Sequence, residues 1–506
     1  MSLLRFLWRF YKVASLYLPL IVGCMFVVLG ALGGDWLLHP ALWGALGLIT
    51  LMGALFLRRS VNLPARDTHG SASFAHSREI ARRGLFKRRG LIIGKRRGRY
   101  LRFAREGHLL TFAPTRSGKG VGCVIPNLLD HRGSVVVSDI KGENYRVTAR
   151  WRAGFSQVLA IAPFSRDIAG ACFNPLDYIR TGQPEDVDDA AMIADLLVVP
   201  KGQDTFWDSE AQNLIVALLL YAAHDLSPEE RNLHHVWSLL MRDRDEFDEV
   251  IADMRASDHQ AIRRAGDGFS QKEERERSAV ISTAQTHMKI WKSPLLADAT
   301  KHSDFALEDI KRGCLSLYIV IPPELLGVYR PFMRLMVGLA ASAMTRVAEL
   351  PEKRVLFLLD EVAALGRMSP IETGIGYLAG YGVSLWLFFQ DLDQLQKTYP
   401  KWRSVIANCS VRQAFGVSDY QTAKELSDML GQRTVPAMSK GLSRDWLVPL
   451  PDGVSHHMAE TGRPLMTPDE IMTMPEDRQL IFVQALRPIL ARKIRYFSEW
   501  MFRFRV

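Results

Sequence analysis

Cysteines are few and isolated in this chain of 506 residues: there are five, and no two of them form a CxxC pair. This pattern excludes a disulfide framework, does not indicate a zinc site, and favours a reducing compartment. The chain also lacks a surplus of Gly, Pro or Gln, and a composition of 48% hydrophobic and 23% charged residues excludes a largely disordered or fibrous protein. We therefore expect a folded chain of about three domains.

Positive charge is in excess, and much of the excess is local. Lys and Arg number 64 and Asp and Glu number 54, which gives a net charge of +10. Residues 78–105 hold twelve Lys or Arg residues and a single acid, Glu79. Such a cluster is typical of a surface that binds anionic lipid headgroups or the phosphates of a nucleic acid. A solvated surface with no dedicated partner is the third interpretation.

Long apolar runs are confined to the N-terminal end. Residues 15–33 and 36–57 are almost free of charge, and each is long enough to cross the ~30 Å hydrocarbon layer as a helix. Basic residues lie before the first run and after the second, so the positive-inside rule places both chain ends in the cytoplasm. The sequence therefore predicts a transmembrane hairpin over residues 1–62. A signal peptide is the alternative, and the second run disfavours it.

A phosphate-binding loop is predicted near the start of the region after the basic cluster. His108 to Ala113 reads as a buried strand, the next seven residues as a turn, and Val121 onward as a helix, which is the context of a P-loop. Backbone N–H groups of such a turn cradle phosphates, and Lys119 adds a mobile positive charge. The match to GxxxxGK[ST] is imperfect, with Ala113 at the first glycine and Gly120 at the hydroxyl position. The predicted phosphate-binding residues are Pro114, Thr115, Arg116, Ser117, Gly118, Lys119, Gly120 and Val121.

Two further apolar strands end in polar residues suited to the same site. Residues 354–361 (RVLFLLDE) end in paired acids, of which Asp360 is expected to hold Mg²⁺ and Glu361 to orient or deprotonate the attacking water. Residues 383–389 end before Gln390, which is placed to sense a γ-phosphate. Apolar strands that alternate with helical stretches favour a mostly parallel sheet covered on both faces, and ligands bind at the carboxyl ends of its strands. The alternative is a strand that ends in an ordinary polar turn.

The distance along the chain between Lys119 and Asp360 predicts an inserted domain. Residues 184–310 carry helical periodicity and few strand-like runs, which indicates an all-α domain. The nucleotide-binding domain is then split into residues 108–183 and 311–506, with 63–107 as a basic juxtamembrane segment. Within the second part, residues 431–466 are expected to be a mobile loop.

The C-terminal tail alternates Arg and Lys with aromatic residues. This composition fits stacking of nucleic acid bases on the aromatic rings, and it also fits packing of the rings against the body of the domain, which we favour.

Four motifs together resemble those of a known family. They are APTRSGKGVGCVIPNLL (113–129), VSDIKGENY (137–145), LFLLDEVAALGR (356–367) and FFQDLDQLQKTYP (388–400). With the apolar N-terminal end, they resemble type IV coupling proteins, the inner-membrane ATPases of bacterial conjugation and type IV secretion, which are related to the FtsK and HerA translocases. The resemblance implies an α/β fold with a RecA-like P-loop NTPase domain, an inserted all-α domain and the transmembrane hairpin. A glycine after the P-loop lysine is usual in the secretion branch of this family.

The resemblance also implies a function and an assembly. The protein is expected to bind ATP and Mg²⁺ as a homo-hexamer in the inner membrane, and to pass relaxase-linked single-stranded DNA, effector proteins, or both, to the type IV secretion channel. A neighbouring subunit's arginine is expected to reach the γ-phosphate, and Arg412 and Arg367 are the candidates. Asp139, Lys141 and Glu143 are similar to the family's DxKGE signature, although a plain turn would use the same residues. The alternatives are a substrate receptor or scaffold that does not pump, and an FtsK-type DNA translocase.

Overall fold

The computed structural model describes residues 67–200, 205–442 and 454–506. Both runs of the predicted transmembrane hairpin lie outside these residues. Over the described ranges, no helix has the length and apolarity needed to cross a membrane. The chain divides into one unit of residues 1–68 and a second of residues 69–506, and nearly all described residues belong to the second unit.

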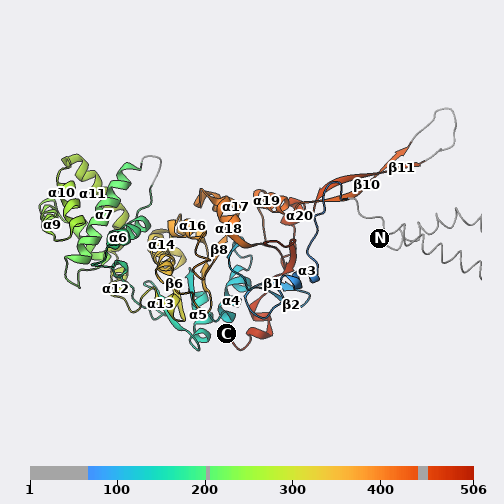
Figure 1. Cartoon of the computed structure of the whole chain (residues 1–506), viewed down its shortest axis with the longest axis horizontal. Coiled ribbons are helices and arrows are strands. Elements are labelled where there is room, and N and C mark those ends of the chain that lie inside the picture. The colour runs from blue at the N-terminus through green and yellow to red at the C-terminus, as the bar shows by residue number, and fades with distance from the viewer. Residues whose placement is uncertain (1–66, 201–204, 443–453) are drawn as a thin grey trace, which may run out of the picture. The chain divides into compact units, whose positions relative to one another are not determined.

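An eleven-stranded sheet forms the centre of this second unit (Figure 1). Its strands follow the order β2-β1-β13-β12-β9-β3-β8-β7-β4-β6-β5. Their bounds are β1 Leu91–Arg96, β2 Arg99–Phe103, β3 His108–Phe112, β4 Val135–Asp139, β5 Gln157–Ile161, β6 Leu315–Val320, β7 Val355–Leu359, β8 Val383–Phe389, β9 Cys409–Ala414, β12 Arg478–Val483 and β13 Ile489–Arg492.

The seven strands from β9 to β5 are all parallel, in agreement with the mostly parallel sheet that the alternation of strands and helices predicted. Phe112 at the end of β3 pairs with Phe389 of β8 and with Ala414 of β9, so three neighbouring strands end at the same level. Leu359 of β7 pairs with Leu387 of β8 in turn. The residues just after these strands therefore meet along one edge of the sheet.

Helices cover both faces of the parallel part because alternate strand residues point to opposite sides. Leu110 and Phe112 face a core shared with α14 (Pro323–Arg346), α17 (Leu392–Thr398) and α19 (Tyr420–Leu430). Leu109 and Ala113 face the opposite core, to which α4 (Ile125–Asp130) contributes. Helix α5 (Glu143–Arg152) packs against β4 and β5.

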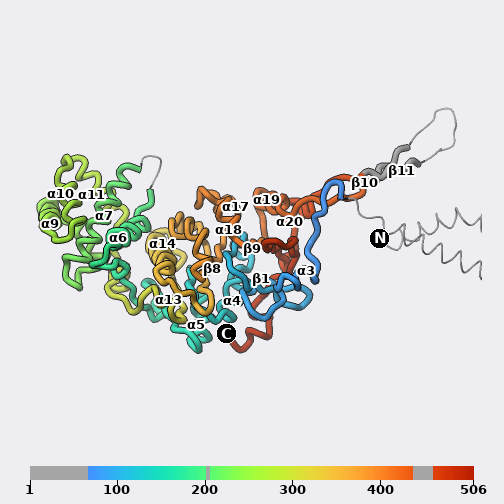
Figure 2. The backbone as a smooth tube through the Cα atoms, in the orientation of Figure 1, coloured from blue at the N-terminus to red at the C-terminus, as the bar shows by residue number. Residues whose placement is uncertain are grey.

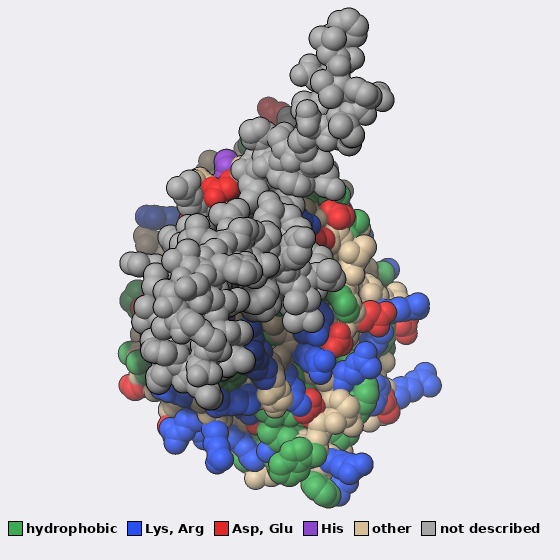
Figure 3. Space-filling model, turned by 90° about the vertical axis from the view of Figure 1, so that its right-hand side faces the viewer, with side chains coloured by type: hydrophobic (Ala, Val, Ile, Leu, Met, Phe, Trp, Pro, Cys, Tyr) green, Lys and Arg blue, Asp and Glu red, His purple; other side chains and the backbone are tan. Residues whose placement is uncertain are grey.

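Residues before and after the nucleotide-binding region complete the sheet. Strands β1 and β2 come from the predicted juxtamembrane segment 63–107, yet they are part of the sheet because β1 pairs with β13 from the C-terminal end. The two ends of the unit lie side by side, as the blue and red parts of the tube show (Figure 2). Helix α3 (Ser77–Arg82) precedes β1. On the face that Figure 3 shows, many Lys and Arg side chains lie on the lower part of the surface, with Asp and Glu side chains among them.

Between β5 and β6, every described element is a helix, as predicted for residues 184–310. Gly338 of α14 lets this helical lobe approach closely, since a Cβ there would overlap the side chain of Leu196. The elements are η3 Pro175–Tyr178, α6 Asp186–Leu197, α7 Phe206–His224, α8 Leu233–Leu240, α9 Arg244–Ala256, α10 Gln260–Ser270, α11 Glu274–Met288, η4 Lys289–Lys292, α12 Pro294–Ala299 and α13 Asp309–Arg312.

The stretch expected to be a mobile loop, 431–466, contains paired strands instead. β10 (Gln432–Leu442) and β11 (Val454–Pro464) are antiparallel, with Gln432 opposite Pro464. Hydropathy did not reveal them because backbone hydrogen bonds set this pairing and the segment has no apolar alternation. Helix α20 (Pro468–Met472) comes next, with the capping box of Thr467 and Glu470 that its sequence predicts.

Candidate functional site

The turn after β3 has the geometry of a phosphate-binding loop. Arg116 and Gly118 adopt left-handed backbone conformations, with φ of 63° and 92°. Ser117 fixes the turn by donating its hydroxyl to the Pro114 carbonyl at 2.6 Å. A π-helical turn, η2 (Gly120–Val124), then leads into α4. The predicted residues 114–121 thus form one compact turn followed by a helix start, an arrangement whose backbone N–H groups suit an anion.

Lys119 reaches from this turn to the two acids that come after β7. Its Nζ lies 2.9 Å from Asp360 Oδ1 and also pairs with Glu361. The side chain is only 13% exposed. Burial disfavours the ammonium form, but the attraction of both carboxylates outweighs it and raises the pKa of Lys119. Residues far apart in the sequence therefore meet as predicted.

Glu361 is turned toward the loop by its backbone. Its φ is 51°, a left-handed conformation that is rare for a residue with a side chain, and its N–H donates to Asp360 Oδ1 at 3.0 Å. Gln390 completes the group by donating from Nε2 to Glu361 Oε2 at 3.0 Å. Burial raises the pKa of Asp360, against the opposing effect of Lys119. Lys119, Asp360, Glu361 and Gln390 thus form one connected cluster, which we call the edge cluster.

Asp139 ends β4 beside this cluster. Its Oδ2 accepts the Tyr145 N–H at 2.8 Å and its Oδ1 accepts from Asn144 Nδ2 at 3.3 Å, so it binds two residues of the first turn of α5. Burial raises the pKa of Asp139 to about 6. Lys141 and Glu143 are exposed. The Asp139 turn therefore stabilises the local fold, and it borders the edge cluster through Ser138, whose hydroxyl donates to the Asp360 carbonyl at 3.1 Å.

The two candidate arginines make their contacts away from the edge cluster of their own chain. Arg412, on β9, lines a narrow apolar space with Ile406 and Leu426, and its Nε is buried without a hydrogen-bond partner among the described residues. Arg367 is exposed and donates its Nε to Glu372 at 2.7 Å. A role for either arginine at a neighbouring subunit's site stays a prediction.

Lys493 is a site neighbour that the sequence did not single out. Its Nζ donates to the Ser117 carbonyl at 2.7 Å and lies 5.0 Å from the centre of the Phe415 ring. Burial lowers the pKa of Lys493. The only sequence signal was the basic character of the C-terminal tail, because the residue reaches the P-loop through the order of strands in the sheet.

The aromatic residues of the tail divide between two environments. Phe502 is fully buried, which agrees with packing against the body of the domain. Glu499 anchors the same segment by binding Lys95 and Tyr100. Phe497, Trp500 and Phe504 are exposed, so packing accounts for only part of the pattern.

The residues present fit a magnesium–nucleotide group. The ammonium group of Lys119 and the carboxylates of Asp360 and Glu361 lie together at one edge of the parallel sheet. Lys119 directly follows the left-handed turn, at the start of a helix. Lys119 can exchange its carboxylate partners for phosphate oxygens, which leaves Asp360 free to bind a hard cation. Gly120 stands where the P-loop pattern has a Ser or Thr hydroxyl. A Cβ placed on Gly120 would meet no atom within 4 Å, so there is open space beside the turn at this position.

Comparison with known proteins agrees with this geometry. The model of the family "Type IV secretory system Conjugative DNA transfer" matches residues 73–505. A conjugal transfer protein TraG of Escherichia coli is 31% identical over 492 residues, which cover 86% of this chain and 77% of that protein. VirD4 of Agrobacterium fabrum is 29% identical, over 86% of this chain and 67% of its own.

A solved structure shares the fold. The plasmid coupling protein TrwB in complex with ADP and Mg²⁺ aligns with a TM-score of 0.63 and 15% identity, over 84% of this chain and 94% of that one. The unbound form of the coupling protein TrwB aligns with a TM-score of 0.64. The described chain therefore has the α/β fold of these proteins, and with the family match over most of its length it belongs to the type IV secretory system conjugative DNA transfer family.

Proposed function

We propose that this protein is the coupling ATPase of a type IV secretion system, which recruits DNA or protein substrates and uses ATP hydrolysis to drive them into the channel. The observation that carries the proposal is the edge cluster, in which Lys119, Asp360, Glu361 and Gln390 converge beside the P-loop turn. Relatives named conjugal transfer protein TraG and type IV secretion system-coupling protein VirD4 support the coupling role.

The residues of the site divide the chemistry among them. When bound, Mg²⁺–ATP supplies a phosphoanhydride whose terminal phosphoryl group is transferred to water. Backbone N–H groups of residues 115–121 hold the phosphates, and Lys119 neutralises their charge. Asp360 holds the Mg²⁺, Glu361 orients and deprotonates the water, and Gln390 positions Glu361 and detects the terminal phosphate. Arg412 and Arg367 of a neighbouring subunit are our candidates for the remaining positive charge.

The assembly and location belong to the same proposal. Two apolar runs with basic flanks support a hairpin in the inner membrane with both termini in the cytoplasm. The assembly we propose is a homo-hexamer whose nucleotides lie between subunits, as the likeness to type IV coupling proteins implies. The expected partners are the secretion channel and a relaxase-linked single strand or effector proteins.

Hydrolysis by the purified full-length protein tests the proposal. We expect ATP turnover that single-stranded DNA stimulates, and Lys119→Ala to lower it at least about a hundredfold. Lys353→Ala is the matched control, because Lys353 is an exposed lysine at the opposite end of β7. If assembled rings showed no turnover with or without DNA, the protein would instead be a receptor or scaffold.

Substrate passage in cells provides the second test. A secretion-competent strain that carries Lys119→Ala should lose transfer of its substrate, whereas Lys353→Ala should keep it. Normal transfer by the Lys119→Ala strain would show that the edge cluster does not drive transport.

A further inference from the structure

Three helix ends of the inserted lobe meet at one point, far along the chain from the edge cluster. Asp186 is the first residue of α6, His224 is the last residue of α7, and His259 directly precedes α10. We call these three residues the helix-end triad.

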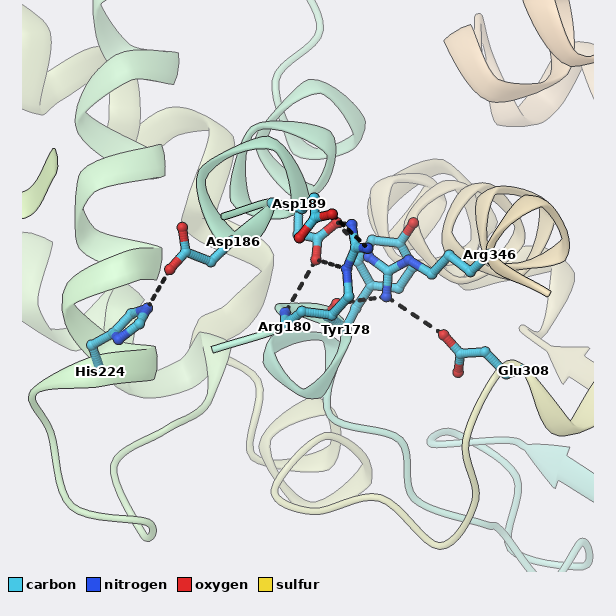
Figure 4. Close-up of polar contacts among 8 residues, drawn as sticks. Tyr178, Arg180, Asp186, Asp189, His224, Glu308 and Arg346 are labelled. Atoms are coloured by element: carbon cyan, nitrogen blue, oxygen red, sulfur yellow. Dashed lines mark hydrogen bonds and ion pairs between the residues drawn. The ribbon is translucent and has the colours of Figure 1, made fainter. Parts of the chain in front are cut away.

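The side chains of the triad direct their ligand atoms at one another. His224 Nε2 lies 3.0 Å from Asp186 Oδ2, and His259 Nε2 lies 3.1 Å from the same oxygen. All three atoms lie within 4.8 Å of one another. Figure 4 shows the His224 ring pointing at the Asp186 carboxylate from the end of α7.

These spacings are close to those of a zinc coordination shell. Zn²⁺ binds imidazole nitrogen and carboxylate oxygen at about 2.0–2.2 Å. In a tetrahedral shell with such bonds, two ligand atoms lie about 3.3–3.5 Å apart. The two nitrogen–oxygen spacings of the triad therefore need to widen by only a few tenths of an ångström to admit the ion.

The charge and burial of the triad suit a divalent ion. The Asp186 side chain is 6% exposed, and the imidazoles are 16% and 23% exposed. The centres of the two imidazole rings lie 4.5 Å apart, and the ring planes meet at an angle of 32°. One carboxylate and two neutral imidazoles form a ligand set of net charge −1 with little exposure to solvent, and His with carboxylate is a preferred ligand set for zinc.

We propose that the helix-end triad binds a transition-metal dication, with Zn²⁺ as the favoured ion. Asp186 Oδ2, His224 Nε2 and His259 Nε2 supply three ligands, and water completes the shell. The proposal does not depend on the ATPase function, because no residue of the edge cluster takes part in it. Motif spacing could not reveal the site, since its ligands come from the ends of three separate helices.

The position of the triad gives metal binding a structural consequence. Asp189 lies one turn after Asp186 on α6 and binds Arg180 with two hydrogen bonds of 2.8 and 2.9 Å. Asp189 also pairs with Arg346 at the end of α14 (Figure 4). The ion would thus tie α7 and α10 to the start of the helix that joins the lobe to the sheet domain. Zinc should raise the thermal stability of this lobe.

A second group of metal-binding residue types provides an internal control. Cys172, His302 and Asp304 also lie near one another, but His302 and Asp304 are exposed. A zinc ion on this surface would be lost with His302, whereas an ion on the triad would not.

Metal analysis of the full-length protein tests the proposal. The protein is stripped with a chelator, loaded with Zn²⁺ or Co²⁺ in the presence of excess Mg²⁺ to fill oxygen-rich sites, and freed of unbound metal. We expect about one bound ion per chain, a visible Co²⁺ spectrum of tetrahedral type, and a higher melting temperature with Zn²⁺. His224→Gln and His259→Gln should each weaken Zn²⁺ binding at least about tenfold, and His302→Gln should leave it unchanged.

The wild-type protein keeps the test decisive if a variant fails to fold. Bound zinc should protect His224 and His259 from diethyl pyrocarbonate, as read by peptide mass spectrometry. The proposal is overturned if the wild-type chain binds no more Zn²⁺ than the double variant His224→Gln, His259→Gln. It is also overturned if the bound ion is lost with His302→Gln, or if Zn²⁺ leaves both triad histidines as reactive as before.

Discussion

Glu361 shows most clearly how single residues prepare the site. A left-handed backbone at a residue with a side chain costs on the order of 1–3 kcal/mol and needs support from its surroundings. Here Lys119 and Gln390 hold both oxygens of the Glu361 carboxylate. The strained conformation therefore places the carboxylate beside the phosphate-binding turn before any ligand arrives.

Glu361→Gln should separate nucleotide binding from hydrolysis. The amide keeps the size of the side chain and its contact with Gln390, but it cannot take a proton from water. We expect ATP hydrolysis to fall about 10²–10⁴-fold while nucleotide affinity stays within a few-fold, measured by steady-state turnover and fluorescent-nucleotide titration. Glu352→Gln, at an exposed glutamate before β7, is the control and should behave as wild type. Equal turnover in the two variants would remove Glu361 from the mechanism.

Two glycines close to Lys119 should respond differently to the same substitution. A Cβ at Gly120 meets nothing within 4 Å, whereas one at Gly122 would lie 2.9 Å from the Ile494 carbonyl oxygen. Gly120→Ala should therefore stabilise the protein by about 0.4–1 kcal/mol, and Gly122→Ala should destabilise it by about 1–3 kcal/mol. Thermal unfolding of the two nucleotide-free variants provides the measurement. The reverse order would show that the C-terminal segment does not lie against η2.

Asp139 should give the stability a defined pH dependence. Burial holds the pKa of Asp139 at about 6 in the fold, above about 3.9 when unfolded. The folded state therefore binds this proton more tightly than the unfolded state does. The resulting contribution of Asp139 to the free energy of unfolding is at most about 3 kcal/mol; it is fully present below about pH 4 and is lost as the pH rises through about 6. Asparagine does not ionise, so the melting temperature of Asp139→Asn should rise relative to that of wild type as the pH increases from 4 to 6. A constant difference across that range would contradict the shift.

At the scale of elements, the sequence predicted which residues the parallel sheet brings together. Strands β3, β7 and β8 are fully buried and mostly apolar, and the residues just after them were predicted to meet at the carboxyl ends of the strands. The approach of Lys493 to the P-loop could not be predicted, because it depends on β13 lying between β12 and β1. Strands β10 and β11 were missed because their pairing rests on backbone hydrogen bonds and leaves no apolar pattern.

Helix α6 depends on a buried arginine of α14. Arg334 is almost fully buried and donates to the Leu196 and Leu197 carbonyls at 2.6 and 3.0 Å. These carbonyls lie in the last turn of α6, where no N–H group of the helix is left to bind them. Arg334→Met keeps much of the volume but leaves both carbonyls unsatisfied, which should cost about 2–4 kcal/mol. Arg330→Met, at an exposed position of α14, should stay within about 0.5 kcal/mol. Equal thermal stability of the two variants would show that Arg334 does not support the lobe.

At the scale of the whole molecule, one sheet joins distant parts of the described chain. β13 pairs with β1, and the tail beyond β13 places Lys493 against the P-loop turn. The segment that precedes β1 is thereby connected to the site through neighbouring strands, although sequence patterns alone placed 63–107 outside the nucleotide-binding domain. The family match and the shared fold agree with this architecture, in which the edge cluster lies at the carboxyl ends of the central parallel strands.

Metal binding at Asp360 tests the central claim most directly. Mn²⁺ can replace Mg²⁺ and is detected by electron paramagnetic resonance, so its binding with ATP can be titrated on the full-length protein. We predict one nucleotide-dependent Mn²⁺ per chain, bound at least about tenfold more weakly in Asp360→Asn. It should bind unchanged in Asp298→Asn, since the Asp298 side chain is 77% exposed. Unchanged binding of Mn²⁺ and ATP by Asp360→Asn would contradict the account.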